Sequence, residues 1–499
     1  MNTEPDRRRR RPPTDGLPRT EPMSPMQVRQ NAAAKRMLRR LVQGENPPTA
    51  PLSIVDRLVG SPYANPMIQV GGVDASARKT IDFALKLAES MFRYGAGALE
   101  VETSMIAITA ALGLKNIEVD ITNQSVAINY APKDQTPITL LRVVRSWTNN
   151  YAGLAQVHQL VTDIVAGGVG REEAVRRLED ITRSAKPYPR WMVTVAFGVF
   201  AAVFVGVLGG GLGASMVAFV SNLLVSLLAR QLGRWRTPDF FITASCSFLV
   251  TIIALLLWRF GSPLGVQIAP AIVVVGGILL LLPTGRLVSA VQDAINGFPV
   301  TAAGRFLSTL LTFGAVVAGI AVGFVVGQLT GSDPIDVTKT FPPAYDLWVV
   351  VILTAVAVLM IGVTEQTSTK LLLPTAAVGV VGYLVLIACD AFGLGSRFAP
   401  ALAAVVIGLL ARVVALRMGA PQLVVAVPAS LILLPGLTIF RSMYVLTIEE
   451  SEILVGAGGM LNAGAIVLGV AAGIVLGDTL ARPLTRSLAS NERRRARRR

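Results

Sequence analysis

The sequence predicts an α-helical polytopic membrane protein with ten transmembrane helices, arranged as two inverted five-helix repeats and preceded by a small soluble α+β domain. Three observations lead to this prediction. The 499 residues are 52% hydrophobic and only 15% charged, whereas a soluble globular chain carries about 25% charged residues. Apolar runs of transmembrane length fill the chain from Trp191 onward. Finally, one apolar motif that ends in proline and glycine occurs twice.

Two basic tails flank the predicted domains. Lys and Arg exceed Asp and Glu by six in residues 1–50 and by six again in residues 485–499, which is most of the net charge of +15. No aromatic residue is interleaved with these arginines, in contrast to segments that bind nucleic acid. We therefore expect a disordered tail over 1–50 and a basic cytoplasmic tail over 483–499, both beside anionic lipid. No apolar stretch follows the first arginines, so no cleavable signal peptide is expected.

Residues 75–187 are expected to form a small cytoplasmic α+β domain. Apolar residues recur first at helical spacing and then in alternation with polar residues. The predicted elements are helices ending near Gly95 and over 98–112, 152–165 and 171–183, and strands over 117–121, 126–130 and 138–144. Gly95-Ala96-Gly97 lies between two helices and not after a strand, so it does not match a phosphate-binding loop.

The remaining chain contains ten transmembrane helix candidates. They cover about 191–208, 212–229, 240–258, 264–282, 306–327, 346–363, 371–389, 398–416, 421–439 and 454–477. The short loops on one side of the membrane hold eight Lys and Arg, and those on the other side hold four. Because basic loops favour the cytoplasm, the N- and C-termini are both expected to be cytoplasmic.

An internal repeat divides the apolar part of the chain. The run 278–285, Ile-Leu-Leu-Leu-Leu-Pro-Thr-Gly, resembles the run 431–436, Leu-Ile-Leu-Leu-Pro-Gly. Each is followed by a semi-polar segment and a glycine-rich helix, which gives five-helix units over 188–330 and 346–482. Units with an odd number of helices insert in opposite orientations, as in the inverted repeats of many secondary transporters. Chance recurrence of a Leu-rich helix end is the alternative.

The two semi-polar segments contain the predicted transport pathway. Proline there frees backbone polar groups, which at membrane depth need protein cover or a cavity. Together with nearby charges, they offer donors for a carboxylate and acceptors for an ammonium. The pathway residues are Pro283, Arg286, Asp293, Asn296 and Arg305 in the first segment and Pro435, Arg441, Glu449, Glu450 and Glu452 in the second. Asp293 is the preferred proton-coupling carboxylate. The alternative is that these charges lie in ordinary aqueous loops.

A few other residues have simpler explanations. Asn222, in the second membrane helix, is a weaker pathway candidate because Asn there often bonds to a neighbouring helix, and Glu365 after the sixth helix is another. The single histidine, His158, is expected on a helix surface, and Cys246 and Cys389 are expected to be small buried apolar residues. This inventory excludes zinc sites and disulfide frameworks, and no metal or cofactor is expected.

The segment Tyr94-Gly-Ala-Gly-Ala-Leu-Glu-Val-Glu-Thr103, followed by Ala110-Ala-Leu-Gly113, resembles the opening motif of the threonine/serine exporter family. The later segments 171–178 and 186–189 resemble the family's lead-in to its first membrane helix. The resemblance covers about residues 76–480 and includes an unusual order of parts, a soluble domain followed by five plus five helices. In some family members the two parts are separate polypeptides.

The resemblance implies a secondary transporter that exports L-threonine and L-serine across the bacterial plasma (inner) membrane, driven by the proton motive force. Its partners would be threonine, serine, protons and membrane lipid, without nucleic acid, and a homo-oligomer is left open. Gly95, Gly97, Glu100 and Glu102 match the family motif in the cytoplasmic domain. Acids near the start of a helix also interact favourably with its dipole, which is a purely structural explanation of the two glutamates.

Two other functions compete with transport. A membrane-embedded hydrolase or transferase would use Asp293 and the glutamates near 450. However, the cytoplasmic domain shows no Gly-x-Ser-x-Gly motif and no Ser/His/Asp set, and an enzyme does not need two inverted halves. A scaffold held by a membrane anchor would not need ten helices. The chain is therefore expected to be a transporter and not an enzyme.

Overall fold

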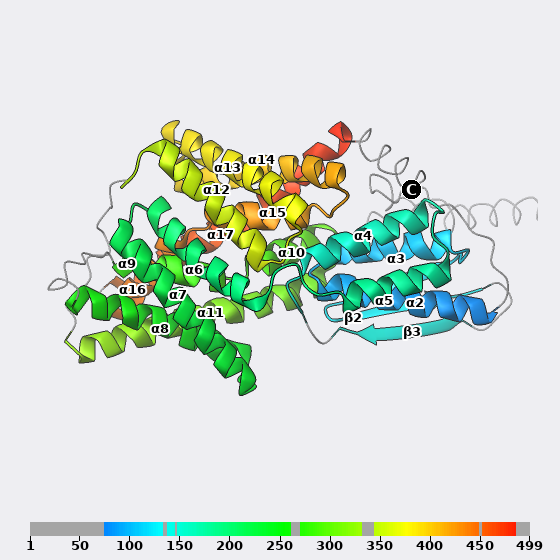
Figure 1. The fold of residues 1–499 in the computed structure, drawn as a ribbon, viewed down its shortest axis with the longest axis horizontal. Coiled ribbons are helices and arrows are strands. Elements are labelled where there is room, and N and C mark those ends of the chain that lie inside the picture. The colour runs from blue at the N-terminus through cyan, green and yellow to red at the C-terminus, as the bar shows by residue number, and fades with distance from the viewer. Residues whose placement is uncertain are drawn as a thin grey trace, which may run out of the picture. The chain divides into compact units, whose positions relative to one another are not determined.

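The computed structural model describes residues 74–132, 137–144, 147–260, 270–331, 344–448 and 452–485. All of them belong to one compact unit, Val55–Arg499. We refer to residues 74–188 as the α+β region and to residues 190–485 as the helical region (Figure 1). The predicted tail over 1–50 and the predicted tail over 483–499 beyond Thr485 lie outside the described residues.

The α+β region contains the predicted elements in the predicted order. They are α2 Asp74–Arg93, α3 Ala98–Ala111, β1 Ile117–Thr122, β2 Ser125–Tyr130, β3 Ile138–Val143, α4 Tyr151–Val165 and α5 Arg171–Arg183. The strands form an antiparallel sheet in the order β1-β2-β3. Between α2 and α3, Gly95 has a φ of +99°, a backbone conformation that glycine adopts without strain.

A small apolar core holds this region together. Four residues on one face of β1 and β2 are at most 6% exposed: Ile117, Ile121, Val126 and Ile128. The side-chain period of two in a strand places this face of the sheet against helices, and α2 contacts β2 and β3 while α3 contacts β1. α4 packs against both α2 and α3. The core thereby fixes the α2–α3 link and the start of α4, two segments that contact the helical region.

His158 is buried, and the prediction that it lies on a helix surface is therefore wrong. Its side chain is 6% exposed, and its Nδ1 atom lies 3.6 Å from Oε1 of Glu100 on α3. Because α4 packs against α3, His158 faces the core while Gln156, two residues earlier, is exposed. The polar sequence around His158 could not show which face of the helix would be covered.

The helical region consists of longer elements. They are α6 Arg190–Val207, α7 Leu212–Arg234, α8 Asp239–Phe260, α9 Pro270–Ile278, the 3-10 turn η3 Leu279–Leu281, α10 Thr284–Ile295, α11 Pro299–Leu329, α12 Leu347–Thr364, α13 Thr369–Ala391, α14 Gly395–Met418, α15 Leu423–Ser430, the 3-10 turn η4 Leu431–Leu433, α16 Gly436–Ile448 and α17 Ile453–Leu484. Within the described ranges, eight helices are long and apolar enough to cross a membrane: α6, α7, α8, α11, α12, α13, α14 and α17.

Two of the ten predicted ranges are not long continuous helices. The range 421–439 is divided, because α15 and η4 end at Leu433 and α16 leaves at a bend of 51°. The range 264–282 is described only from Pro270, where it contains the short α9 and η3. Proline explains both ends, since Pro283 and Pro435 have no N–H and restrict the residue before them. Every residue of α9 and of α15 is buried.

The same order of elements occurs twice in the helical region. Three long helices are followed by a short helix, a 3-10 turn, a second short helix and one very long helix, first from α6 to α11 and then from α12 to α17. Helices at equivalent places also pack alike, because α8 contacts α11 extensively and α14 contacts α17 extensively. The equivalents of α9 and α10 are α15 and α16.

Glycines allow both of these helix pairs to approach closely. A Cβ atom on Gly323 of α11 would lie 2.7 Å from Cγ2 of Thr251 on α8, and one on Gly319 would collide with the Ala244 carbonyl oxygen. In the second pair, a Cβ atom on Gly473 of α17 would lie 2.5 Å from the Ala401 carbonyl oxygen of α14. Small residues at such contacts are typical of helix packing in membranes.

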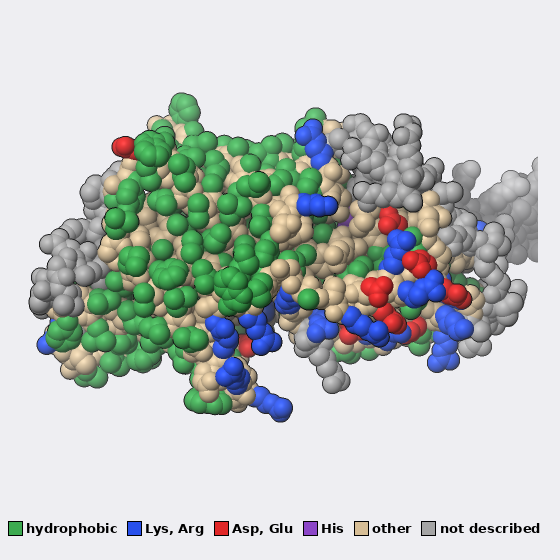
Figure 2. Space-filling model, in the orientation of Figure 1, with side chains coloured by type: hydrophobic (Ala, Val, Ile, Leu, Met, Phe, Trp, Pro, Cys, Tyr) green, Lys and Arg blue, Asp and Glu red, His purple; other side chains and the backbone are tan. Residues whose placement is uncertain are grey.

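The surface differs between the two regions. On the face shown in Figure 2, hydrophobic side chains cover the long helices, whereas Lys, Arg, Asp and Glu gather over the α+β region. Many large apolar side chains of the helical region are more than half exposed, for example Leu212 at 77% and Leu373 at 73%. An exposed apolar surface of this extent is what a lipid environment requires.

We predict that Gly477→Ala destabilises the protein, because the added methyl group would collide with the Val405 carbonyl oxygen of α14. Overpacking of this kind costs about 1–3 kcal/mol. The matched control is Gly464→Ala in the same helix, where a Cβ atom meets no other atom within 4 Å. Thermal unfolding in detergent should show a lower midpoint for Gly477→Ala alone. Equal midpoints for the two variants would contradict the close packing of α14 and α17.

Candidate functional site

The first turn of α3 is joined to the helical region by Asp293. The backbone N–H of Ala98 donates a hydrogen bond of 2.8 Å to Oδ1 of Asp293, which is 1% exposed on α10. The first N–H groups of a helix have no partner within it, and the N-terminal end of a helix attracts negative charge. Gly97, the residue before α3, offers no side-chain cap. Asp293 therefore caps the N-terminus of α3 from a distant part of the chain.

Arg305 of α11 completes this contact. Its Nη1 atom lies 2.7 Å from Oδ2 of Asp293, and its Nη2 atom donates a hydrogen bond of 3.1 Å to the Ala96 carbonyl oxygen. The rings of Phe92 and Trp147 lie 5.3 and 5.2 Å from the guanidinium carbon, within the range of cation–π contacts. Arg305 is thus held by the α+β region on several sides while it neutralises Asp293. We call Asp293 and Arg305 the buried pair.

Two further contacts join the regions. Thr301 of α11 donates a hydrogen bond of 3.0 Å to the Ile121 carbonyl oxygen and accepts one of 3.0 Å from the Asn123 backbone N–H. At the start of α4, the backbone N–H groups of Tyr151 and Ala152 donate to the carbonyl oxygens of residues 365 and 366, at 3.1 and 2.9 Å. These contacts and the buried pair fix the α+β region against the ends of α10, α11 and α12.

Gln366 strengthens the contact at the end of α12. Its side chain accepts a hydrogen bond of 3.0 Å from the Tyr188 backbone N–H and donates one of 3.1 Å to the Tyr188 carbonyl oxygen. Gln366 has a φ of +58°, which is uncommon for a residue other than glycine. Two hydrogen bonds to one residue hold the side chain in place, and so the turn between α12 and α13 has a defined conformation.

A cavity of about 380 Å³ lies between the contacts that join the two regions. The α+β region contributes Arg93, Tyr94, Gly95, Asn123, Gln124, Trp147, Thr148, Asn149 and Tyr151 to its wall, and the helical region contributes Asp239, Ile242, Thr243, Leu281, Leu282, Pro283, Gly285, Arg286, Ser289, Gly304, Arg305, Ser308, Thr312, Glu365 and Leu423. The break between η3 and α10 and the first residue of α15 both face this cavity. Its volume is at the lower end of the range for small-molecule sites.

Charges of both signs line the cavity. Arg93, Arg286 and Arg305 bring positive charge, and Asp239 and Glu365 bring carboxyl groups. Glu365 lies in the turn between α12 and α13, outside both spans, and burial raises its pKa to about 7, while Arg286 and Lys186 attract the ionised form. A site that presents guanidinium and carboxyl groups across one small cavity can bind a zwitterion.

The structure places only some of the predicted pathway residues together. Pro283, Arg286 and Arg305 line the cavity, and so does Gly95. Asp293 is joined to Arg305 at the edge of this group, and Asn296 ends α10. The remaining residues lie elsewhere: Pro435 and Arg441 at the start of and within α16, exposed Glu452 before α17, and Asn222 in α7, where it donates to the Ala218 carbonyl oxygen of its own helix. Glu449 and Glu450 lie outside the described residues.

The family motif residues lie in and just before the first turns of α3, and Gly97 lies beside Asp293. Gly97 precedes α3, and a Cβ atom there would lie 3.5 Å from Oδ1 of Asp293. Glu100, in the first turn, contacts His158, and Glu102 is 4% exposed within α3. The motif therefore builds the end of α3 that meets Asp293.

Sequence reasoning missed several residues of the cavity. Arg93, Trp147, Tyr151 and Asp239 line it although no sequence pattern singles them out, and Glu365 is only a weaker candidate from the sequence. Asn150 gave a usable local signal, since it accepts a hydrogen bond from the Gly153 N–H and so marks the start of α4. No signal in the sequence brings the start of α4 to the end of α12.

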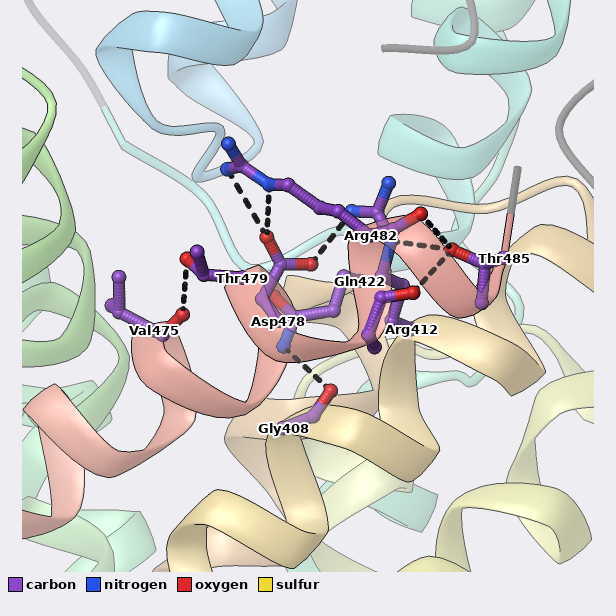
Figure 3. A network of polar contacts seen from close by, with 9 residues as sticks. Gly408, Arg412, Gln422, Val475, Asp478, Thr479, Arg482 and Thr485 are labelled. Carbon is purple, nitrogen blue, oxygen red and sulfur yellow. Dashed lines mark hydrogen bonds and ion pairs between the residues drawn. The ribbon is translucent and has the colours of Figure 1, made fainter. Parts of the chain in front are cut away.

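A second ion pair, which is partly buried, joins α14 and α17 (Figure 3). Nη1 of Arg412 lies 2.8 Å from Oδ1 of Asp478, which is 6% exposed, and Nε of Arg412 donates to the Thr485 hydroxyl at 3.0 Å. In the first unit, Arg259 of α8 donates to the Thr330 carbonyl oxygen at the end of α11. An arginine thus links the equivalent helix ends in both units, and these contacts serve packing.

Comparison with known proteins identifies the family. A family model described as "Putative threonine/serine exporter" matches residues 82–327, and one described as "Threonine/Serine exporter, ThrE" matches residues 350–480. A probable threonine/serine exporter of Mycobacterium tuberculosis is 31% identical over 425 residues, which cover 83% of this chain and 79% of that protein. The chain belongs to the threonine/serine exporter family. Its apolar helices and these relatives make it a multi-pass bacterial membrane protein.

Two other relatives extend the comparison. A threonine/serine exporter of Corynebacterium glutamicum is 28% identical over 442 residues, which cover 87% of this chain and 89% of that protein. A probable succinate transporter subunit, YjjP, of Klebsiella aerogenes is 26% identical over 266 residues, which cover 98% of that protein but 52% of this chain. A chain of about half the length therefore exists as a separate subunit among the relatives. No solved structure matches this exporter-family chain.

We predict that Asp293→Ala loosens the contact between the regions, because it leaves Arg305 buried without its counter-charge. Removing one partner of a buried ion pair costs about 3–5 kcal/mol. Hydrogen–deuterium exchange should accelerate at residues 95–98 and remain unchanged in α17. The control is the double variant Asp293→Ala/Arg305→Met, in which no unpaired charge remains and an apolar side chain fills the space between the two aromatic rings. Unchanged exchange in the single variant would rule out this role.

Proposed function

We propose that this protein exports L-threonine and L-serine from the cytoplasm across the bacterial plasma membrane, driven by the proton motive force. The observation that carries the proposal is the polar cavity between the α+β region and the ends of α10, α11 and α12, lined by guanidinium and carboxyl groups. A zwitterionic amino acid needs both charges, and two relatives are named as exporters of these amino acids.

The charge pattern favours an amino acid over a dicarboxylate. A dicarboxylate such as succinate, named for the relative YjjP, carries two negative ends that match Arg93, Arg286 and Arg305. Glu365 and Asp239 share the cavity with these arginines. Ionised carboxylates would repel a dicarboxylate and attract an ammonium group, so they select for a zwitterion.

We further propose ten membrane crossings in two inverted five-helix repeats. A Cβ atom on Gly285 would lie 3.3 Å from Val427, and one on Gly436 would lie 2.7 Å from Val275. Val275 and Val427 each precede their break proline by eight residues, and Gly285 and Gly436 follow theirs by two residues and one residue, so the two contacts correspond to within one residue. Such reciprocal contacts are characteristic of a twofold axis, and five crossings per repeat place that axis in the membrane plane. The first family model ends near the end of α11, at residue 327, and the second begins near the start of α12, at residue 350.

In this arrangement both termini and the α+β region are cytoplasmic. Exposed Arg230, Arg234 and Arg236 at the end of α7 support this orientation through the bias of basic residues toward the cytoplasm. The cavity would then be the cytoplasmic entrance, closed on one side by the α+β region. α16, which follows the second break, would lie at the opposite membrane surface, and Figure 1 draws α10 and α16 at different ends of the helical region.

The contacts of Asp293 favour an anchoring role over proton coupling. Both of its carboxylate oxygens are occupied, one by Ala98 and one by Arg305. A proton carrier must be free to change its charge and its contacts during each cycle. Coupling to the proton gradient therefore belongs to a carboxyl group that faces the cavity. The competing hydrolase or transferase would require bond cleavage by the purified protein, which a product assay with a threonine-containing dipeptide measures directly.

We predict that deletion of the gene makes cells accumulate threonine when they are loaded with a threonine-containing dipeptide, and that restoring the gene restores efflux. A protonophore should slow the restored efflux, because it removes the driving force. Serine-containing dipeptide should give the same pattern, and succinate efflux should not change. Threonine efflux that is identical in the two strains would remove the substrate assignment, and efflux insensitive to the protonophore would remove the proton coupling.

We predict that residues after the two breaks are labelled from opposite sides of the membrane. In a background with Cys246→Ala and Cys389→Ala, exposed Ala294 of α10 and exposed Glu452 before α17 can each be replaced by cysteine. A membrane-impermeant maleimide added to intact cells should label Glu452→Cys, and it should label Ala294→Cys only after permeabilisation. Labelling of both positions from one side would disprove the inverted repeat.

A further inference from the structure

We propose that Arg286 and Glu365 bind the α-carboxylate and the α-ammonium group of a single amino acid in the cavity between the α+β region and the helical region. This assignment rests on the proposed function and names its substrate site. It also makes Glu365 the group at which a proton and the substrate compete. Arg286 belongs to α10, directly after the break at Pro283, and Glu365 belongs to the turn after α12. The site therefore combines residues from both repeats.

Neither side chain has a polar partner in the part of the chain that the structure describes. Among the described residues, the guanidinium of Arg286 and the carboxyl of Glu365 make no hydrogen bond and no ion pair within 4 Å, although each lines the cavity. Arg305, by contrast, is paired with Asp293 and Ala96. Arg286 attracts the ionised form of Glu365 from across the cavity. A ligand that brings its own carboxylate and ammonium can satisfy both groups at once.

Hydrogen bonds hold the backbone at Glu365, and Tyr151 packs beside the backbone next to Arg286. The carbonyl oxygen of Glu365 accepts a hydrogen bond from Tyr151, and the next residue, Gln366, is bound twice to Tyr188. On the opposite side, the Tyr151 hydroxyl oxygen would lie 3.3 Å from a Cβ atom on Gly285, which places Tyr151 against the backbone beside Arg286. Tyr151 thus contacts both halves of the site. Fixed binding groups lose little entropy when a ligand binds.

Charged and titratable groups from several elements face Glu365. They are Arg286 of α10, Lys186 before α6 and Tyr151 of α4, and Arg93 of α2 and Arg190 of α6 lie near Lys186. Asp239 of α8 and Arg305 of α11 line the same cavity. Burial nevertheless outweighs the attraction of the cations and raises the pKa of Glu365 to about 7. The carboxyl group therefore changes its charge near neutral pH.

Because of this pKa, the carboxyl group of Glu365 can hold a proton or pair with the ammonium group of the substrate, but it cannot do both at once. Above its pKa, Glu365 is ionised and pairs with the ammonium group of the substrate. Below its pKa, Glu365 holds a proton and offers the ammonium no counter-charge, so the affinity for substrate falls as the pH falls. When an amino acid displaces the proton, the proton is released to the solution. Such exclusive binding is a simple physical basis for exchanging a proton against an amino acid.

Binding to the full-length protein in detergent tests this assignment with matched ligands. The probes are L-threonine, threoninamide, which lacks the carboxylate, and N-acetylthreonine, which lacks the ammonium. Glu365→Gln should weaken threonine binding about tenfold or more, since a charge-assisted contact is lost, and should leave N-acetylthreonine unaffected. Arg286→Gln should weaken threonine binding similarly and leave threoninamide unaffected. A merely structural effect would weaken all three ligands equally, which would overturn the assignment.

The pH dependence gives a second readout. The affinity of the unmodified protein for threonine should rise between about pH 6 and pH 8 and should change up to about tenfold per unit below the pKa. Glu365→Gln should abolish this dependence, and Glu365→Asp should retain it because a carboxyl group remains. The matched control is Asp390→Asn, an exposed carboxylate at the end of α13 that does not line the cavity. A pH profile that persists in Glu365→Gln would overturn the assignment.

The outcomes separate this site from the proposed function. If the unmodified protein transports threonine and the Glu365 and Arg286 variants bind and transport it equally well, the site is wrong and the exporter stands. If the unmodified protein binds succinate and neither threonine nor serine, the proposed function fails and the site fails with it. The third outcome is that Glu365→Gln also weakens N-acetylthreonine, or Arg286→Gln also weakens threoninamide, in variants whose thermal unfolding is normal. That outcome excludes this pair of residues as the site.

Discussion

The buried pair of Asp293 and Arg305 is the interaction on which the rest of the site depends. Two opposite charges in a low-dielectric setting are tolerated only when each is satisfied, and here each is completed by backbone groups of the α2–α3 link. The contact therefore specifies one position of the α+β region against α10 and α11. The cavity exists because the α+β region is held in that position.

The two proline breaks determine where polar groups occur in an otherwise apolar bundle. α9 and α15 are buried along their whole length, so their ends can be freed from helical hydrogen bonding only where protein or a cavity receives the polar backbone. The first break faces the cavity and the α+β region. The second break faces α9 through Gly436 and Val275. The same sequence element thus lines a polar cavity at the first break and makes a packing contact at the second.

Individual residues show how far sequence reasoning reached. The helix and strand order of the α+β region and eight of the ten membrane ranges follow from local patterns, because periodicity and helix ends are properties of neighbouring residues. Pro283, Arg286 and Arg305, which the sequence predicts in one pathway, line one cavity, although the sequence could not show that Arg305 would be paired with Asp293. The burial of His158 and the position of Glu365 in the cavity wall could not be predicted, because both depend on what packs against these residues from a distant part of the chain.

The sequence by itself determined which segments are apolar enough for a membrane, where the two helix breaks fall and which residues match the family motif. Composition, proline and local spacing decide these features because each acts within a few residues. Only the tertiary structure decided which charges are neutralised and which face a cavity. Glu365 and Arg286 are 79 residues apart in the chain, and only the folded structure brings them to the wall of one cavity. The charge state of a carboxyl group depends on desolvation and on nearby charges, and both arise from parts of the chain that meet only when it folds.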